Sequence, residues 1–247
     1  MKRYLHAFGM CQSMFCAIPS PWQGWDEEAR DKMLLFLPAV GLELGILWAL
    51  LDWIIRLLDL PVLAGALALC AYPYLSTGFL HLDGFMDVTD AVKSCRDLQR
   101  RREILKDSHV GSFAVIGCVL LMLAQFAMAA SLPRVGTEGL LVLLPAVSRC
   151  CSALAVTVLR PMSTSQYAAQ AKPKSHLYLL TAMLLAGLAA GFVVSFRTGL
   201  ALLGCLAGYA LALRHGYRSL DGMNGDIAGD SLTLGELCGI AVYALAR

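Results

Sequence analysis

The segment from His81 to Asp90 is rich in side chains that could carry out chemistry. Asp83, Asp87 and Asp90 follow the spacing i, i+4 and i+7, which places them along one face of a helix. Neighbouring carboxylates repel one another unless a cation intervenes, and carboxylate oxygens are ligands that suit Mg²⁺. We therefore predict that the three aspartates bind Mg²⁺, with His81 as a ligand, a base or a supporting hydrogen-bonding group. In the alternative interpretation, Asp83 caps a helix and the other two face solvent.

A second polar stretch runs from Asp221 to Asp230 and contains three glycines. Glycines among polar residues indicate a tight, irregular backbone whose N–H groups could cradle a phosphate. Asp226 could add another metal ligand. The residues expected to contact substrate here are Gly222, Asn224, Gly225 and Asp226.

Charged and polar residues outside these two stretches extend the prediction. Arg149 lies inside an apolar block, where it either pairs with Glu43 or Glu236 or contacts a substrate phosphate. Asp107 and Ser108 stand just before another apolar block and are further candidates for substrate binding. The amphipathic segment 98–107 has a basic face that could bind lipid headgroups or a phosphorylated substrate, or could simply set the membrane topology.

Together these groups fit the transfer of a phosphate-linked group, with Mg²⁺ neutralising charge. The sequence contains no Walker A motif and no Gly-x-Ser-x-Gly elbow. Its nine cysteines include no CxxC pair, so no zinc site or disulfide framework is expected. The net charge of +2 is too small to argue for a nucleic-acid partner.

The elements that must position these groups are apolar. Hydrophobic residues make up 58% of the 247 residues, only 15% are charged, and the mean hydropathy is +0.64. Apolar blocks of about twenty residues are long enough to span a bilayer. We predict an all-α, polytopic membrane bundle of six to seven transmembrane helices with cytoplasmic amphipathic helices, forming a single domain over 1–247 with a cytoplasmic or interfacial lead-in over 1–31. The expected spans are 33–51, 60–79, 110–130, 139–159, 177–196, 199–213 and a weaker one over 232–246.

The distribution of positive charge predicts the orientation of this bundle. On the alternating topology, fifteen of the twenty lysines and arginines fall on one side and four on the other, with Arg149 inside a span. Positive charge in short loops stays cytoplasmic, so both polar stretches are expected to face the cytoplasm, from a multi-pass protein of the cell inner membrane.

Several segments, in order along the chain, resemble sequence motifs of the cobalamin synthase family, whose members are membrane-bound adenosylcobinamide-GDP ribazoletransferases. Residues 77–90 are similar to the family pattern T-G-G-x-H-x-D-G-x-x-D-x-x-D, and residues 104–111 to I-x-x-D-S-x-x-G. Further matches are Ser148-Arg149, Asn224-Gly225-Asp226, Gly235-Glu236-Leu237, Pro38-Ala39-Val40-Gly41 and Ile18-Pro19-Ser20-Pro21. Phe79, His109 and Thr233 depart from residues common in the family, but none of these changes removes a carboxylate of the main cluster.

The resemblance implies a Mg²⁺-dependent reaction in which the 5′-hydroxyl of α-ribazole, or of its phosphate, attacks the phosphate on cobinamide and GMP leaves. It implies that Asp83, Asp87 and Asp90 hold Mg²⁺ on the diphosphate, and that His81 or a carboxylate deprotonates the hydroxyl. Asp107 and Asp226 would complete the metal or ribose site, and Arg149 would steady the phosphate. It also implies a lipid bilayer as surroundings and, as further partners, a second copy of the chain or other enzymes of cobamide assembly.

Two other enzyme classes and a transporter are alternatives to a ribazoletransferase. A CDP-alcohol-type phosphotransferase needs Asp three residues before Asp83, where Leu80 stands, and Ala-Arg where Asp87-Val88 stands. An aspartate-rich prenyltransferase would need a second Asp-rich repeat. A transporter would use Glu43, Arg149 and Glu236 as a relay and would be indifferent to the aspartates.

Overall fold

The computed structural model describes residues 2–20, 24–162, 165 and 173–246, and this part of the chain is helical, with no strand. The elements are α1 (Lys2–Phe15), the 3₁₀ helix η1 (Arg30–Phe36), α2 (Leu37–Leu57), α3 (Val62–Leu75), α4 (Leu80–Lys93), α5 (Leu98–Ile104), α6 (Ser112–Ala130), α7 (Glu138–Val158), α8 (Lys174–Val194), α9 (Phe196–Leu220) and α10 (Gly225–Leu245). The all-α prediction is confirmed. Pro21, Lys172 and Arg247, which entered the sequence arguments, lie outside the described residues.

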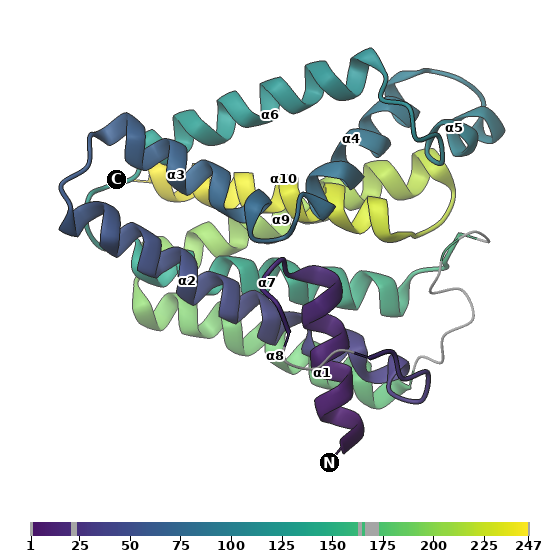
Figure 1. Cartoon of the computed structure of the whole chain (residues 1–247), viewed down its shortest axis with the longest axis horizontal. Coiled ribbons are helices and arrows are strands. Elements are labelled where there is room, and N and C mark those ends of the chain that lie inside the picture. The colour runs from purple at the N-terminus through teal and green to yellow at the C-terminus, as the bar shows by residue number, and fades with distance from the viewer. Residues whose placement is uncertain (1, 21–23, 163–164, 166–172, 247) are drawn as a thin grey trace.

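The long helices lie side by side as a multi-pass membrane bundle (Figure 1). Among the described residues, five helices are long and apolar enough to span a membrane: η1 continuing into α2, then α6, α7, α8 and α9. A sixth span results if α3 and α4 count as one bent pair. The expected weaker span near the C-terminus is a 21-residue helix, α10, but it is not among these five because Asp226, Asp230 and Glu236 make it less apolar.

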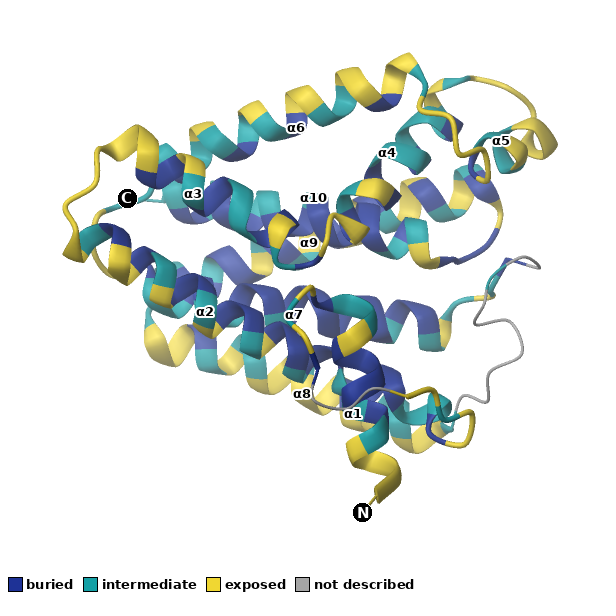
Figure 2. Ribbon diagram, in the orientation of Figure 1, coloured by how far each residue is buried: buried dark blue, intermediate teal, exposed yellow. Residues whose placement is uncertain are grey.

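Burial separates helices at the centre of the bundle from helices at its surface (Figure 2). In the most apolar window of α7, 67% of the residues are buried, against 11% in α8. Large apolar side chains of α8, such as Leu185 and Val193, are exposed. Because apolar side chains gain nothing from facing water, this exposed surface is typical of a helix that contacts lipid.

The chain bends sharply by 83° between α3 and α4. Gly78 and Phe79 both adopt the left-handed conformation, with φ of 58° and 64°. Thr77 Oγ1 donates to the carbonyl of Pro73 at 2.8 Å and helps to close the end of α3. The bend turns α4 out of the direction of α3, so that α4 crosses α10 (Figure 1). The predicted helix through the aspartates is confirmed, but the bend that aims it is not visible in the hydropathy.

The segment 1–31, expected as a cytoplasmic or interfacial lead-in, contains helix α1, which packs against the bundle. Helix α1 contacts η1 and α2 and buries Ala7, Met10 and Cys11. The Nε2 of Gln12 donates to Oε1 of Glu43 at 3.1 Å. The buried side of α1 therefore packs against η1 and α2.

Candidate active site

Two glycines allow α4 and α10 to cross at very short range. A Cβ on Gly84 of α4 would lie 2.9 Å from the carbonyl oxygen of Asp226, and a Cβ on Gly229 of α10 would lie 3.2 Å from the Cα of His81. Both neighbours are backbone atoms that cannot rotate away. The crossing therefore depends on glycine at these positions. It brings Asp226, from the C-terminal stretch, beside the aspartate cluster, although Asp226 lies 142 positions after Gly84 in the chain.

Negative charge gathers at this crossing. Asp83 is exposed, whereas Asp87 and Asp226 are partly buried. Asp87 interacts electrostatically with Asp83, Asp226 and Asp90, and Asp226 interacts with Asp83. In the described part of the chain, no three His, Cys, Asp or Glu side chains already stand as a metal-ligand group. The binding of Mg²⁺ by Asp83, Asp87 and Asp90 therefore stays a prediction.

Asp90 has a second, structural set of contacts. Its two carboxylate oxygens accept hydrogen bonds from the backbone N–H groups of Gly111 at 2.6 Å and Ala114 at 3.1 Å. These groups belong to the first turn of α6 and its preceding residue, where N–H groups lack intrahelical partners. A Cβ on Gly111 would overlap the Asp90 carboxylate. Asp90 therefore fastens the end of α4 to the start of α6.

The glycine-containing stretch is helical over most of its length, which corrects the expectation of an irregular loop. Only residues 221–224 lie outside helices, and α10 begins at Gly225. Asn224 Oδ1 accepts from the N–H of Ile227 at 3.0 Å, so Asn224 is the N-cap, and its Nδ2 donates to Oδ2 of Asp226 at 2.6 Å. A good cap at Asn224 overrides the low helix propensity of the glycines that follow. Gly222, with φ of 150°, packs against Met162 instead.

Two arginines of α5, Arg101 and Arg102, contact carbonyl groups at the end of α9. Arg102 Nε donates to the carbonyl of Leu220 at 3.0 Å and its Nη2 to that of Asp221 at 2.7 Å. Arg160 also donates to the carbonyl of Asp221, at 3.1 Å. Cations at a helix C-terminus stabilise its unpaired carbonyls. Of the amphipathic helix predicted over 98–107, the structure forms α5 as far as Ile104, and it gives these arginines a role that the sequence did not reveal.

Asp107 and Ser108 lie in the exposed connection before α6. The backbone N–H and the ring nitrogen of His109 contact Oδ1 of Asp107 at 3.0 and 2.6 Å and hold the pKa of Asp107 below its ordinary value. Asp107 is therefore ionised at neutral pH. None of its contacts joins it to the carboxylates at the α4–α10 crossing.

Arg149 is an internal ion-pairing residue. Its Nη1 lies 2.9 Å from Oε1 of Glu236, the same oxygen that accepts from Ser148 Oγ at 2.6 Å. The Arg149 side chain is 2% exposed. Of the two pairings expected from the sequence, the one with Glu236 is confirmed and the one with Glu43 is wrong, because Glu43 pairs with Gln12. A charge this deep requires a partner, and Glu236 on α10 supplies it.

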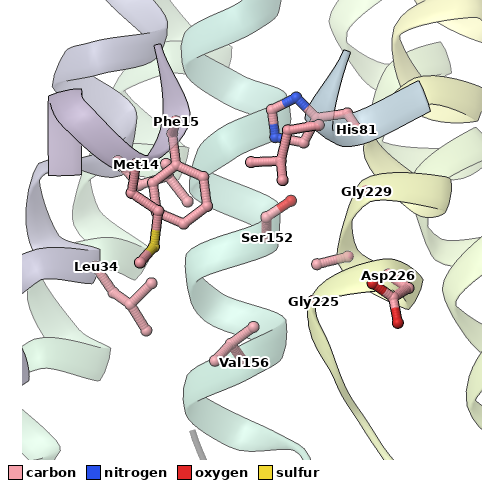
Figure 3. A pocket seen from close by; sticks show the side chains of 12 residues that line it. Met14, Phe15, Leu34, His81, Ser152, Val156, Gly225, Asp226 and Gly229 are labelled. Atoms are coloured by element: carbon pink, nitrogen blue, oxygen red, sulfur yellow. The ribbon is translucent and has the colours of Figure 1, made fainter. Parts of the chain in front are cut away.

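A cavity of about 300 Å³ opens beside Asp226 (Figure 3). Figure 3 shows three apolar side chains from α1 and η1 on one side, polar residues from α4 and α10 on the other, and α7 between them. These residues are Met14, Phe15 and Leu34, then His81 and Asp226, then Ser152 and Val156. The His81 and Phe15 rings are nearly parallel, with centroids 6.5 Å apart. The cavity makes His81 and Asp226, far apart in sequence, parts of one site.

Sequence reasoning missed the part of this site that α7 contributes. Ser152 stands four residues after Ser148, and its hydroxyl donates to the Ser148 carbonyl at 3.3 Å. Its position one helical turn beyond the Ser148-Arg149 match is the signal that could have identified it. Leu34 and Val156 carry no such signal, because apolar residues are ordinary in a membrane helix.

Comparison with known proteins places the chain among proteins of one description. The family model described as Cobalamin-5-phosphate synthase matches residues 7–244. An adenosylcobinamide-GDP ribazoletransferase of Clostridium perfringens (strain 13 / Type A) is 36% identical over 251 residues, covering 99% of this chain and 100% of the relative. Proteins of the same name from Clostridium botulinum (strain Alaska E43 / Type E3) and Lachnoclostridium phytofermentans are 32% and 29% identical, covering 97% of this chain and 97% and 94% of themselves. No solved structure matches the chain significantly.

Proposed function

The chain belongs to the cobalamin-5-phosphate synthase family, and we propose that it joins the cobinamide half of adenosylcobinamide-GDP to α-ribazole or α-ribazole 5′-phosphate. In this reaction the 5′-hydroxyl oxygen forms a bond to the phosphorus attached to cobinamide, the bond from that phosphorus to the GMP oxygen breaks, and GMP leaves. The observation that carries the proposal is the α4–α10 crossing, which brings Asp226, a residue that lines the cavity, beside the carboxylates of Asp83 and Asp87.

The donor set at the crossing fits Mg²⁺. Asp83, Asp87 and Asp226 offer hard carboxylate oxygens and no thiolate, which suits Mg²⁺ rather than zinc. We propose these three as the residues that hold the ion, with Asp90 as the residue that fixes α4 in place, because both Asp90 oxygens already accept backbone hydrogen bonds. When bound, Mg²⁺ would neutralise charge on the diphosphate.

Other protein groups in and around the cavity would accept the proton of the attacking hydroxyl, orient the site and support its helices. Asp226 lies at the cavity rim and can accept the proton of the attacking hydroxyl, while Asn224 keeps its carboxylate in one orientation. His81, buried on the same side of the cavity as Asp226, is the second candidate for this proton. Arg149 stays in the core beside Glu236 and supports the helices that carry these residues.

We propose that this site faces the cytoplasm from the cell inner membrane. The support is the sequence itself, in which fifteen lysines and arginines fall on the side of the alternating topology that carries both polar stretches, against four on the other side.

The proposal is tested with purified protein in detergent, supplied with adenosylcobinamide-GDP, α-ribazole and Mg²⁺. We expect GMP and cobalamin to form in equal amounts, and no GMP when α-ribazole is left out. Absence of cobalamin from a folded, pure sample would refute the proposed function. Release of GMP without α-ribazole would identify a hydrolase instead.

A further inference from the structure

The cavity beside Asp226 has two chemically different halves. Met14, Phe15 and Leu34 form an apolar half, and His81 and Asp226 lie in a polar half. The His81 ring is stacked on Phe15 and lines the cavity, so its ring nitrogens lie on the polar side. A ligand that fits must therefore have one end that needs no hydrogen bonds and another that forms several.

The size of the cavity restricts which part of the substrates it can hold. About 300 Å³ is at the lower end of the range of small-molecule sites. This volume suits a single nucleoside and is too small for the corrin macrocycle of cobinamide. Two nucleosides take part in the proposed reaction, the guanosine of the leaving group and the incoming ribazole.

The apolar half distinguishes between these two nucleosides. Guanine carries hydrogen-bonding groups around its edge, which would lose their water partners without replacement against Met14, Phe15 and Leu34. The base of α-ribazole is a dimethylated benzimidazole, with an apolar edge and a single free ring nitrogen. Its flat face suits the nearly parallel rings of Phe15 and His81, which differ in plane by 7°.

We propose that this cavity is the binding site for α-ribazole, with the base in the apolar half and the ribose 5′-hydroxyl at Asp226. His81 and Ser152 then lie within the walls around the ring nitrogen and the ribose hydroxyls. This arrangement points the nucleophile at the carboxylates of α4 while adenosylcobinamide-GDP approaches from outside the cavity. The inference rests on the proposed function and adds a division of the site between the two substrates.

Val156 offers the most direct test, because it lines the cavity and is 5% exposed. In Val156→Phe the larger ring occupies space that the base needs. We expect the KM for α-ribazole to rise at least about tenfold, while the KM for adenosylcobinamide-GDP stays within about twofold. Val158→Phe is the matched control, since Val158 lies two residues further along α7 and is 60% exposed; it should behave as wild type.

Val156→Ala provides a second test in case the larger side chain prevents folding. Loss of two methyl groups from the wall should raise the KM for α-ribazole by about three- to tenfold and leave the other KM unchanged. An unchanged KM for α-ribazole in folded Val156 variants, or a rise confined to adenosylcobinamide-GDP, would overturn the inference. Because the wild type must turn over in the same assay, failure of the proposed function would be seen separately, as absence of product from all proteins.

Discussion

Replacement of Gly84 by alanine tests whether the α4–α10 crossing positions the reacting groups. A new Cβ would lie 2.9 Å from the Asp226 carbonyl oxygen, and ordinary contact requires about 3.4 Å or more, so the helices must separate by about 0.5 Å. A displacement of 1 Å at a reacting centre costs about 100-fold in rate, so half of that should cost about tenfold. Overpacking of about 1–3 kcal/mol, offset by about 1 kcal/mol of better helix propensity, predicts a loss of about 0–2 kcal/mol in stability.

Two glycines of α10, Gly229 and Gly225, extend this test to variants that should force the helices apart by smaller distances. At Gly229 the new Cβ would lie 3.2 Å from His81 backbone atoms, so the helices need to separate by only about 0.2 Å and the rate should fall about two- to threefold. At Gly225 a new Cβ would have nothing within 4 Å, so Gly225→Ala needs no separation of the helices and should lose less rate than Gly84→Ala. Initial rates of cobalamin formation and thermal unfolding in detergent are measured for all three variants. If Gly84→Ala is as active as Gly225→Ala, the crossing does not position the chemistry.

Two further predictions concern stability. Glu236→Gln should destabilise the protein by about 3–5 kcal/mol because it leaves the buried Arg149 charge without its partner. In thermal unfolding, the double variant with Arg149→Met and Glu236→Leu should recover much of this loss. A double variant no more stable than the single one would contradict the ion-pair role. Phe79→Gly should raise the free energy of unfolding by about 1 kcal/mol, because Phe79 is held at φ of 64° and its side chain is exposed. A lower unfolding temperature would mean that packing of the Phe79 ring outweighs the backbone strain.

The parts of the fold that depend on local composition were predictable from the sequence. Apolar blocks identified the long helices, with ends that differ by up to seven residues, and the spacing of Asp83, Asp87 and Asp90 identified α4 as a helix with acidic residues on one face. The charge of Arg149 required a buried partner, and Glu236 was one of the two acidic residues within other spans.

The parts that depend on contacts between distant segments were not predictable. Asp90 is spaced as a metal ligand would be, yet its role as a helix cap depends on the N–H groups of Gly111 and Ala114 lying beside it. The glycines at 225 and 229 suggested a loop because their propensity is low, whereas a cap at Asn224 and a close helix crossing explain them. The cavity wall from α1 depends on docking of an N-terminal segment that hydropathy gives no reason to place in the interior.

Dependence of the transfer on Mg²⁺ and on Asp87 tests the central claim most directly. Cobalamin formation is measured against Mg²⁺ concentration after removal of metals with EDTA, for the wild type, Asp87→Asn and Asp59→Asn. Asp59 pairs with Arg134 at 3.1 Å, away from the crossing, and serves as the control. We expect the wild type and Asp59→Asn to be inactive in EDTA and to regain activity when Mg²⁺ is added. The rate of Asp87→Asn should be lower by about 100-fold or more at all Mg²⁺ concentrations, equivalent to about 3 kcal/mol of transition-state stabilisation. Full activity in EDTA, or a near-wild-type rate for Asp87→Asn, would contradict the account.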